Sequence, residues 1–228
     1  MSFLPWLGLF ETLRVKDGAP LEAAEHWETL RASAAALAIP LRGERPERSL
    51  PQETGRWRWI VDAEGNLSEF FSPEADPAPV PYRLALAPQR LGSRNWDARH
   101  KTISYLTHWQ ARRSVEADEA VLLNEHGLLA TGAMSNLFWV KTGRLHTPRS
   151  EAGCRTGVVR GWVLRHAAVE EGDYPAQALD EADEIFVTNS WIGIRAVCAW
   201  NGRTLATGPV TAGLIADRAG RASRPPGN

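Results

Sequence analysis

Cysteine, long apolar runs and an excess of either charge are all scarce in this chain of 228 residues. Its two cysteines, Cys154 and Cys198, are too few for a disulfide scaffold or a cysteine metal cluster, and we expect no metal. No run of 18 apolar residues and no basic-then-apolar leader occurs, so we expect neither a membrane span nor a secretory signal. The net charge of −1 gives no electrostatic reason to expect nucleic acid or an acidic membrane as a partner. We therefore expect a soluble cytoplasmic protein.

Strand and helix signals alternate through the first half of the chain, whose length suits one large domain or two small ones. A strand is predicted over residues 4–15, followed by the turn residues of Lys16-Asp17-Gly18. Apolar residues at spacings of three and four predict a helix over 21–39, which Pro40 ends. Further strands are predicted over 56–61, 67–71 and 82–87.

The second half carries its densest signals between residues 100 and 140. Lys101 stands just before a helix predicted over 105–117. Strands are expected over 120–124, 128–130 and 135–140, and the first two are joined by the turn residues Asn124-Glu125-His126-Gly127. Later elements are a strand arm over 144–147, a helix over 157–169 with Thr156 as its N-cap, a strand over 184–189 and a helix over 211–219.

The order of these motifs resembles the fold-type IV pyridoxal 5'-phosphate (PLP) enzymes, the class IV aminotransferase family. Its members include branched-chain and D-amino-acid aminotransferases and 4-amino-4-deoxychorismate lyase. The matching pieces are Phe10-Glu11-Thr12, His26 to Ser33, Lys101 to Tyr105, Leu123-Asn124, Gly127, Ser135-Asn136-Leu137-Phe138 and Thr147-Pro148. The segment Thr188-Asn189-Ser190 to Val197 is most similar to the lyases.

The resemblance implies an α+β fold of two small domains, residues 1–88 and 94–228, with the first domain shortened. It also implies a homodimer with PLP in the cleft between the domains. Lys101 would be the Schiff-base lysine, which must lose its proton near neutral pH. The implied cofactor contacts are Thr131, Ser135, Asn136, Gly157, Val158, Val159, Asn189, Ser190 and Arg31, and the implied substrate contacts are Thr12, Arg14 and Tyr105.

Three positions depart from the family pattern. Thr29 stands where the family has an arginine that holds the PLP phosphate, so Arg31 is taken as the nearest replacement. Val159 replaces the hydroxyl residue of a second phosphate motif, although the backbone donors of a helix start would survive. Thr131 replaces a glutamate that keeps the pyridine nitrogen protonated. A threonine offers only a neutral hydrogen bond, which favours elimination over transamination.

We therefore expect a PLP-dependent lyase that converts 4-amino-4-deoxychorismate to 4-aminobenzoate and pyruvate, a step in folate precursor synthesis. Two alternatives stay open: an aminotransferase of amino and keto acids, and a paralogue that has lost the cofactor and acts as a binding protein. Lys101 also has the ordinary interpretation of an exposed surface lysine, and His26 that of a core histidine. Ser135 and Asn136 could instead tie the backbone. Arg14, Arg94 and Arg99 are equal candidates for binding a substrate carboxylate.

Overall fold

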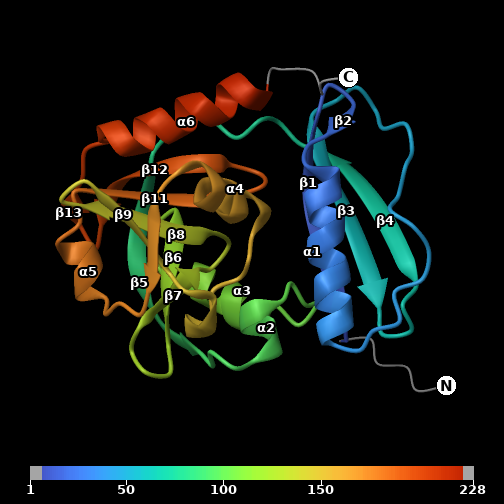
Figure 1. The fold of residues 1–228 in the computed structure, drawn as a ribbon, viewed down its shortest axis with the longest axis horizontal. Coiled ribbons are helices and arrows are strands. Elements are labelled where there is room, and N and C mark those ends of the chain that lie inside the picture. Colours follow the sequence, from blue (N-terminus) through green and yellow to red (C-terminus); the bar gives the residue numbers. More distant parts are fainter. Residues whose placement is uncertain (1–6, 223–228) are drawn as a thin grey trace.

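The computed structural model describes residues 7–222, which form two units that lie side by side (Figure 1). The predicted α+β class is confirmed. The N-terminal unit, drawn in blue to teal, contains β1 (Gly8–Lys16), β2 (Ala19–Pro20), α1 (Ala23–Ala36), β3 (Gly55–Asp62) and β4 (Leu67–Pro73). Residues 4–6 of the predicted first strand lie outside the described residues.

The N-terminal unit is an antiparallel sheet in the order β2-β1-β3-β4, with α1 packed on one face. Side chains of β1 and β3 alternate between buried and partly buried, as expected for a strand with one face on the core. Leu9, Leu13, Trp57 and Trp59 form that core with Leu30 of α1. The predicted helix is three residues too long at its end, because α1 stops at Ala36.

The C-terminal unit begins with β5 (Tyr82–Leu91) and holds the larger sheet of the described chain, in the order β10-β9-β8-β11-β12-β5-β6-β7. Its other elements are α2 (Trp96–Arg99), α3 (Leu106–Arg113), β6 (Glu119–Asn124), β7 (Leu129–Gly132), β8 (Asn136–Lys141), β9 (Arg144–Pro148), a 3₁₀ turn (Ser150–Ala152), α4 (Val158–His166), β10 (Val169–Gly172), α5 (Gln177–Asp180), β11 (Glu184–Asn189), β12 (Gly193–Trp200), β13 (Arg203–Thr204) and α6 (Pro209–Ala222). Strands β6, β8 and β11 are buried along almost their whole length, so they form the centre of this unit.

The predicted domain boundary between residues 88 and 94 is too late. Strand β5 pairs with β6 and β12, so it belongs to the C-terminal sheet from Tyr82 onward. The division between the sheets therefore lies in residues 74–81, a proline-rich stretch without regular structure. Pro88 does not end the strand, because the pairing of β5 with β6 shifts register between Leu86 and Arg90.

Two helices also differ from the sequence prediction. The helix after Lys101 is shorter, since α3 spans Leu106–Arg113 rather than 105–117. Thr156 is not the N-cap of α4; that position is Gly157, and no side chain caps it. The first backbone N–H groups of α4 therefore have no side-chain acceptor at the cap. Over the described range, no helix is long and apolar enough to cross a membrane.

The segment that carries Lys101 joins the two units. The backbone N–H of Phe10 donates to the Lys101 carbonyl (2.8 Å), and that of Ile103 donates to the Gly8 carbonyl (3.0 Å). These bonds make residues 101–103 a short extra partner of β1. At the opposite side, Arg218 of α6 pairs with Glu22 just before α1 (2.8 Å). Lys101 is thus fixed at the junction.

Candidate functional site

Lys101 lies where two adjoining hollows meet, an inner pocket and an outer groove. The inner pocket is enclosed by α1, the segment before α3, the β7–β8 turn, the start of α4 and the end of β11. Its lining residues are Glu11, His26, Thr29, Ser33, Arg99, Lys101, Tyr105, Thr131, Gly132, Ala133, Met134, Ser135, Asn136, Arg155, Thr156, Gly157, Val158, Thr188, Asn189 and Ser190.

Successive side chains of β1 point to opposite faces of the strand, so alternate residues face the inner pocket and the outer groove. Glu11 points with Leu9 and Leu13 toward α1, whereas Phe10 and Thr12 line the outer groove. The buried Glu11 carboxylate lies 2.7 Å from Nδ1 of His26, which is also buried. Burial opposes ionisation of Glu11, but the charge of Lys101 and the hydrogen bond from His26 together lower its pKa. Glu11 is therefore a carboxylate beside the lysine.

The amine of Lys101 is poised between its charged and neutral forms. Burial, which penalises the ammonium, lowers the pKa of Lys101 to about 8. The Glu11 carboxylate opposes that shift, while Arg155 adds to it. Its Nζ lies 4.8 Å from the centre of the Phe10 ring. A pKa near 8 leaves roughly a tenth of the lysine uncharged at pH 7, far more than an ordinary lysine.

Arg155 supplies a cation inside the pocket. Its Nη2 donates to the Tyr105 hydroxyl (2.8 Å) and lies 3.3 Å from Nε2 of His108. The Tyr105 hydroxyl in turn donates to the Ala133 carbonyl (3.0 Å). Burial and the charge of Arg155 lower the pKa of His108 to about 3, so His108 is a neutral neighbour. Tyr105 and His108 therefore hold the guanidinium in place without neutralising it.

The β7–β8 turn forms the pocket wall through internal hydrogen bonds. The Thr131 hydroxyl donates to the Ser135 carbonyl (2.8 Å), and the Ser135 hydroxyl donates to the buried carboxylate of Glu119 (2.8 Å). Asn136 Nδ2 donates to the Arg155 carbonyl (2.8 Å) and thereby ties the loop before α4 to β8. Thr131, Ser135 and Asn136 thus line the pocket and also tie the backbone.

The start of α4 lies against that wall. A Cβ at Gly157 would come within 2.3 Å of Asn136 Oδ1, so any other residue there would force the Asn136 side chain to shift. Opposite it, Asn189 Oδ1 accepts from the backbone N–H groups of Trp191 and Ile192, which shapes the loop around Ser190. Thr188 is fully buried, and the described part of the chain offers its Oγ1 no hydrogen-bond partner.

The outer groove lies on the other side of Lys101 and combines apolar and cationic side chains. Thr12, Lys101 and Tyr105 line it together with Tyr82 and Trp191. Three arginines, Arg56, Arg58 and Arg112, also face it. Arg56 pairs with Glu74, whereas within residues 7–222 neither Arg58 nor Arg112 has an ion-pair partner. Two acidic residues also line the groove, but Asp118 pairs with Arg83 (3.2 Å) and Glu119 is buried. The remaining cations and the aromatic side chains suit an anion with an apolar body.

Three residues predicted from the sequence are not brought to the pocket. Arg31 is exposed on the far side of α1, where its guanidinium pairs with Glu28 (3.2 Å). Val159 is buried in the core between α4 and β11. Arg14 bonds to Asp76 (2.6 Å) and does not line either hollow. The phosphate role expected of Arg31 and the substrate role expected of Arg14 are therefore not supported by geometry.

Other pocket residues were given no role from the sequence. Glu11 and His26 lie in segments that match the family pattern, but they come from different elements, and His26 was interpreted as a core histidine. Helical spacing was a further sign, because Thr29 and Ser33 follow His26 at three and seven residues and so share its face. Arg155 lies in a loop without periodicity, so nothing in the sequence placed it beside Lys101.

Comparison with known proteins agrees with this geometry. A model of the amino-transferase class IV family matches residues 8–200. The chain belongs to that family. It is 27% identical to an aminodeoxychorismate lyase of Bacillus subtilis, covering 85% of this chain and 77% of the relative. It is 28% identical to a probable branched-chain-amino-acid aminotransferase of Thermotoga maritima, covering 91% and 83%.

The fold of this chain is also similar to that of a solved structure. The crystal structure of a putative 4-amino-4-deoxychorismate lyase from Legionella pneumophila matches with a TM-score of 0.83 and 25% identity, covering 93% of this chain and 90% of that one. Membership of the class IV family makes the chain an enzyme of the aminotransferase or aminodeoxychorismate lyase-like type. Members of this family depend on PLP.

The pocket residues fit PLP. Lys101 presents a partly deprotonated amine to the pocket, as covalent attachment of an aldehyde requires. The start of α4 offers uncapped N–H groups, which suit a phosphate. Thr188 Oγ1 and His26 Nε2 are buried polar atoms of the pocket wall that lack partners among residues 7–222. The site thus has unused donors and acceptors where a polar ligand would lie.

The first prediction concerns the titration of Lys101. Labelling of Lys101 by an amine-reactive reagent, followed by peptide mass spectrometry across pH 6–11, should be half-maximal near pH 8. Glu11→Gln should move that midpoint lower, because its carboxylate stabilises the ammonium. Arg155→Leu should move it higher. Glu28→Gln, on the exposed face of α1, serves as the control. A wild-type midpoint near 10.5 would contradict the prediction.

Proposed function

We propose that this class IV enzyme uses PLP attached to Lys101 to convert 4-amino-4-deoxychorismate to 4-aminobenzoate and pyruvate. The observation that carries the proposal is Thr131. Threonine is uncharged, and the hydroxyl proton of Thr131 is donated to the Ser135 carbonyl (2.8 Å). The side chain therefore offers a ring nitrogen neither a charge nor that proton. The similarity to the Bacillus subtilis lyase supports the same choice.

The residues of the pocket would hold the cofactor as follows. Lys101 would bind it covalently, and the α4 start with Ser190 would face its phosphate. When bound, PLP withdraws electrons from the carbon next to an amine. Lys101 Nζ, with a pKa of about 8, is the group able to take and return a proton at that carbon. Glu11, held by His26, sets the charge beside it.

The outer groove supports a dianionic ring as the substrate. Aminodeoxychorismate carries two carboxylates on an apolar ring system, and Arg58 and Arg112, which form no ion pair within residues 7–222, face the groove. Tyr82 and Trp191 provide flat apolar surface next to them. The ring becomes aromatic when the amine-bearing ring carbon loses its proton and the neighbouring ring carbon–oxygen bond breaks. Enolpyruvate leaves with that bonding pair and takes up a proton to become pyruvate. That elimination needs less stabilisation of negative charge than amine transfer does.

The second prediction tests reaction type. Wild type should release pyruvate from aminodeoxychorismate while forming pyridoxamine phosphate slowly from simple amino acids. Thr131→Glu should raise amine transfer by roughly tenfold, about the gain of a charge-assisted hydrogen bond, and should raise pyruvate release less. Thr131→Gln is the matched uncharged control. Ready amine transfer by wild type without pyruvate release would contradict the lyase assignment and favour an aminotransferase instead.

We also propose that the enzyme is a homodimer that associates around the segment carrying Lys101. Trp96, Leu106 and Trp109, on α2 and α3, expose 57%, 61% and 52% of their surface, which is unusual for large apolar side chains. Burial of such side chains is typical of a permanent interface.

The third prediction follows from this exposure. Sedimentation analysis at micromolar concentration should show a dimer for wild type and a monomer for Trp109→Glu. Phe70→Glu, at a similarly exposed position on β4, should leave the dimer intact. A monomeric wild type would contradict the proposed dimer. If Phe70→Glu dissociated the dimer and Trp109→Glu did not, the interface would instead involve β4.

A further inference from the structure

We propose that Arg99 binds the phosphate of the cofactor in this protein, in place of a cation on α1. The inference rests on the proposed use of PLP and assigns a residue that the sequence left undecided. Arg99 is the last residue of α2, two residues before Lys101, and it lines the inner pocket but not the outer groove. It therefore lies on the side of Lys101 away from the substrate groove.

The guanidinium of Arg99 has donors to spare. Its Nε donates to the Ser93 carbonyl (3.2 Å), and within the described chain no carboxylate pairs with it. An arginine carries five N–H donors in a planar fork, which suits the oxygens of a phosphate. The bond through Nε leaves both terminal nitrogens of Arg99 available to a ligand.

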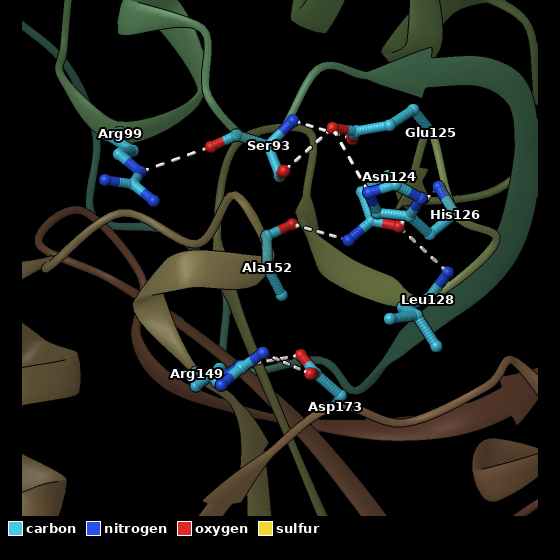
Figure 2. Close-up of polar contacts among 9 residues, drawn as sticks. All are labelled: Ser93, Arg99, Asn124, Glu125, His126, Leu128, Arg149, Ala152 and Asp173. Atoms are coloured by element: carbon cyan, nitrogen blue, oxygen red, sulfur yellow. Dashed lines mark hydrogen bonds and ion pairs between the residues drawn. The ribbon is translucent and has the colours of Figure 1, made fainter.

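The position of Arg99 is set by a relay from the β6–β7 turn (Figure 2). Glu125 accepts from the backbone N–H of Ser93 (2.7 Å) and from its hydroxyl (2.8 Å), and the Ser93 carbonyl then accepts from Arg99. These bonds lower the pKa of Glu125, so it stays ionised. In the same turn, Asn124 Nδ2 donates to the Ala152 carbonyl (3.1 Å) in the loop that leads to α4. One turn thus holds both Arg99 and the approach to the helix start.

The surroundings of Arg99 in the pocket complement an anion. The uncapped start of α4 offers backbone N–H groups, and Thr188 adds a fully buried hydroxyl without a partner in residues 7–222. Thr29 of α1 lines the same pocket but carries no charge, and Arg31 lies outside it. Among the described pocket residues, Glu11 is the carboxylate, and its charge is taken up by His26 and Lys101. The other guanidinium of this pocket, that of Arg155, is held by the Tyr105 hydroxyl (2.8 Å) beside His108. Arg99 is thus the exposed pocket cation whose terminal nitrogens are left to meet a phosphate.

The fourth prediction uses paired ligands. Arg99→Gln should weaken PLP binding roughly tenfold to a hundredfold, as expected for loss of a charged hydrogen bond, and should leave binding of pyridoxal unchanged because pyridoxal has no phosphate. Dissociation constants are measured by absorbance and tryptophan fluorescence on the purified apoprotein. Arg99→Lys should recover part of the affinity. Arg165→Gln is the control, since Arg165 is exposed near the end of α4 and does not line the pocket.

A rescue variant separates the phosphate role from a general effect on folding. Adding Thr29→Arg to Arg99→Gln should restore PLP affinity, because the new guanidinium enters the same pocket from α1. Equal loss of PLP and pyridoxal binding would overturn the inference in favour of a structural role. Unchanged PLP affinity with a raised KM for substrate would overturn it in favour of substrate binding and leave the proposed function standing. A wild type that binds neither ligand would overturn both.

Discussion

Two main-chain hydrogen bonds between β1 and residues 101–103 determine the geometry of the site. They carry Lys101 out of the C-terminal unit and place its side chain against Glu11 and Phe10 of the N-terminal unit. Since the bonds involve only backbone atoms, the side chains of this stretch remain available for chemistry. The same pairing divides the hollow around Lys101 into an inner pocket and an outer groove, because alternate residues of β1 face opposite sides.

The charges around Lys101 are balanced rather than neutralised. Burial favours the neutral amine, Glu11 favours the ammonium, and Arg155 opposes Glu11. His26 fixes the orientation of Glu11 through a hydrogen bond of 2.7 Å. Glu119, the other buried glutamate near the site, differs from Glu11. Burial raises the pKa of Glu119, and its carboxyl group accepts from Ser135 and so holds the β7–β8 turn. Similar residue types therefore have different roles according to their neighbours.

Much of the fold could be predicted from local patterns, and less of the site. Strand β11 has the predicted bounds because an apolar run lies between polar ends. Arg31 lies outside the pocket because, at 100° per residue, it is about 140° around α1 from His26. Thr29, by contrast, shares the side of His26. Arg99 depends on a turn some 30 residues away in the sequence, and no local pattern reports such a contact.

Lys101 is the proposed point of covalent attachment, and the composition of the chain makes this assignment easy to test. The sequence contains three lysines, Lys16, Lys101 and Lys141. Purified protein is incubated with PLP, reduced with borohydride and digested, and the modified peptide is identified by mass spectrometry. Wild type should give one stoichiometric adduct on Lys101 and a visible absorbance band before reduction, and Lys101→Ala should give neither. An adduct retained by Lys101→Ala, or none in wild type at saturating PLP, would contradict the assignment.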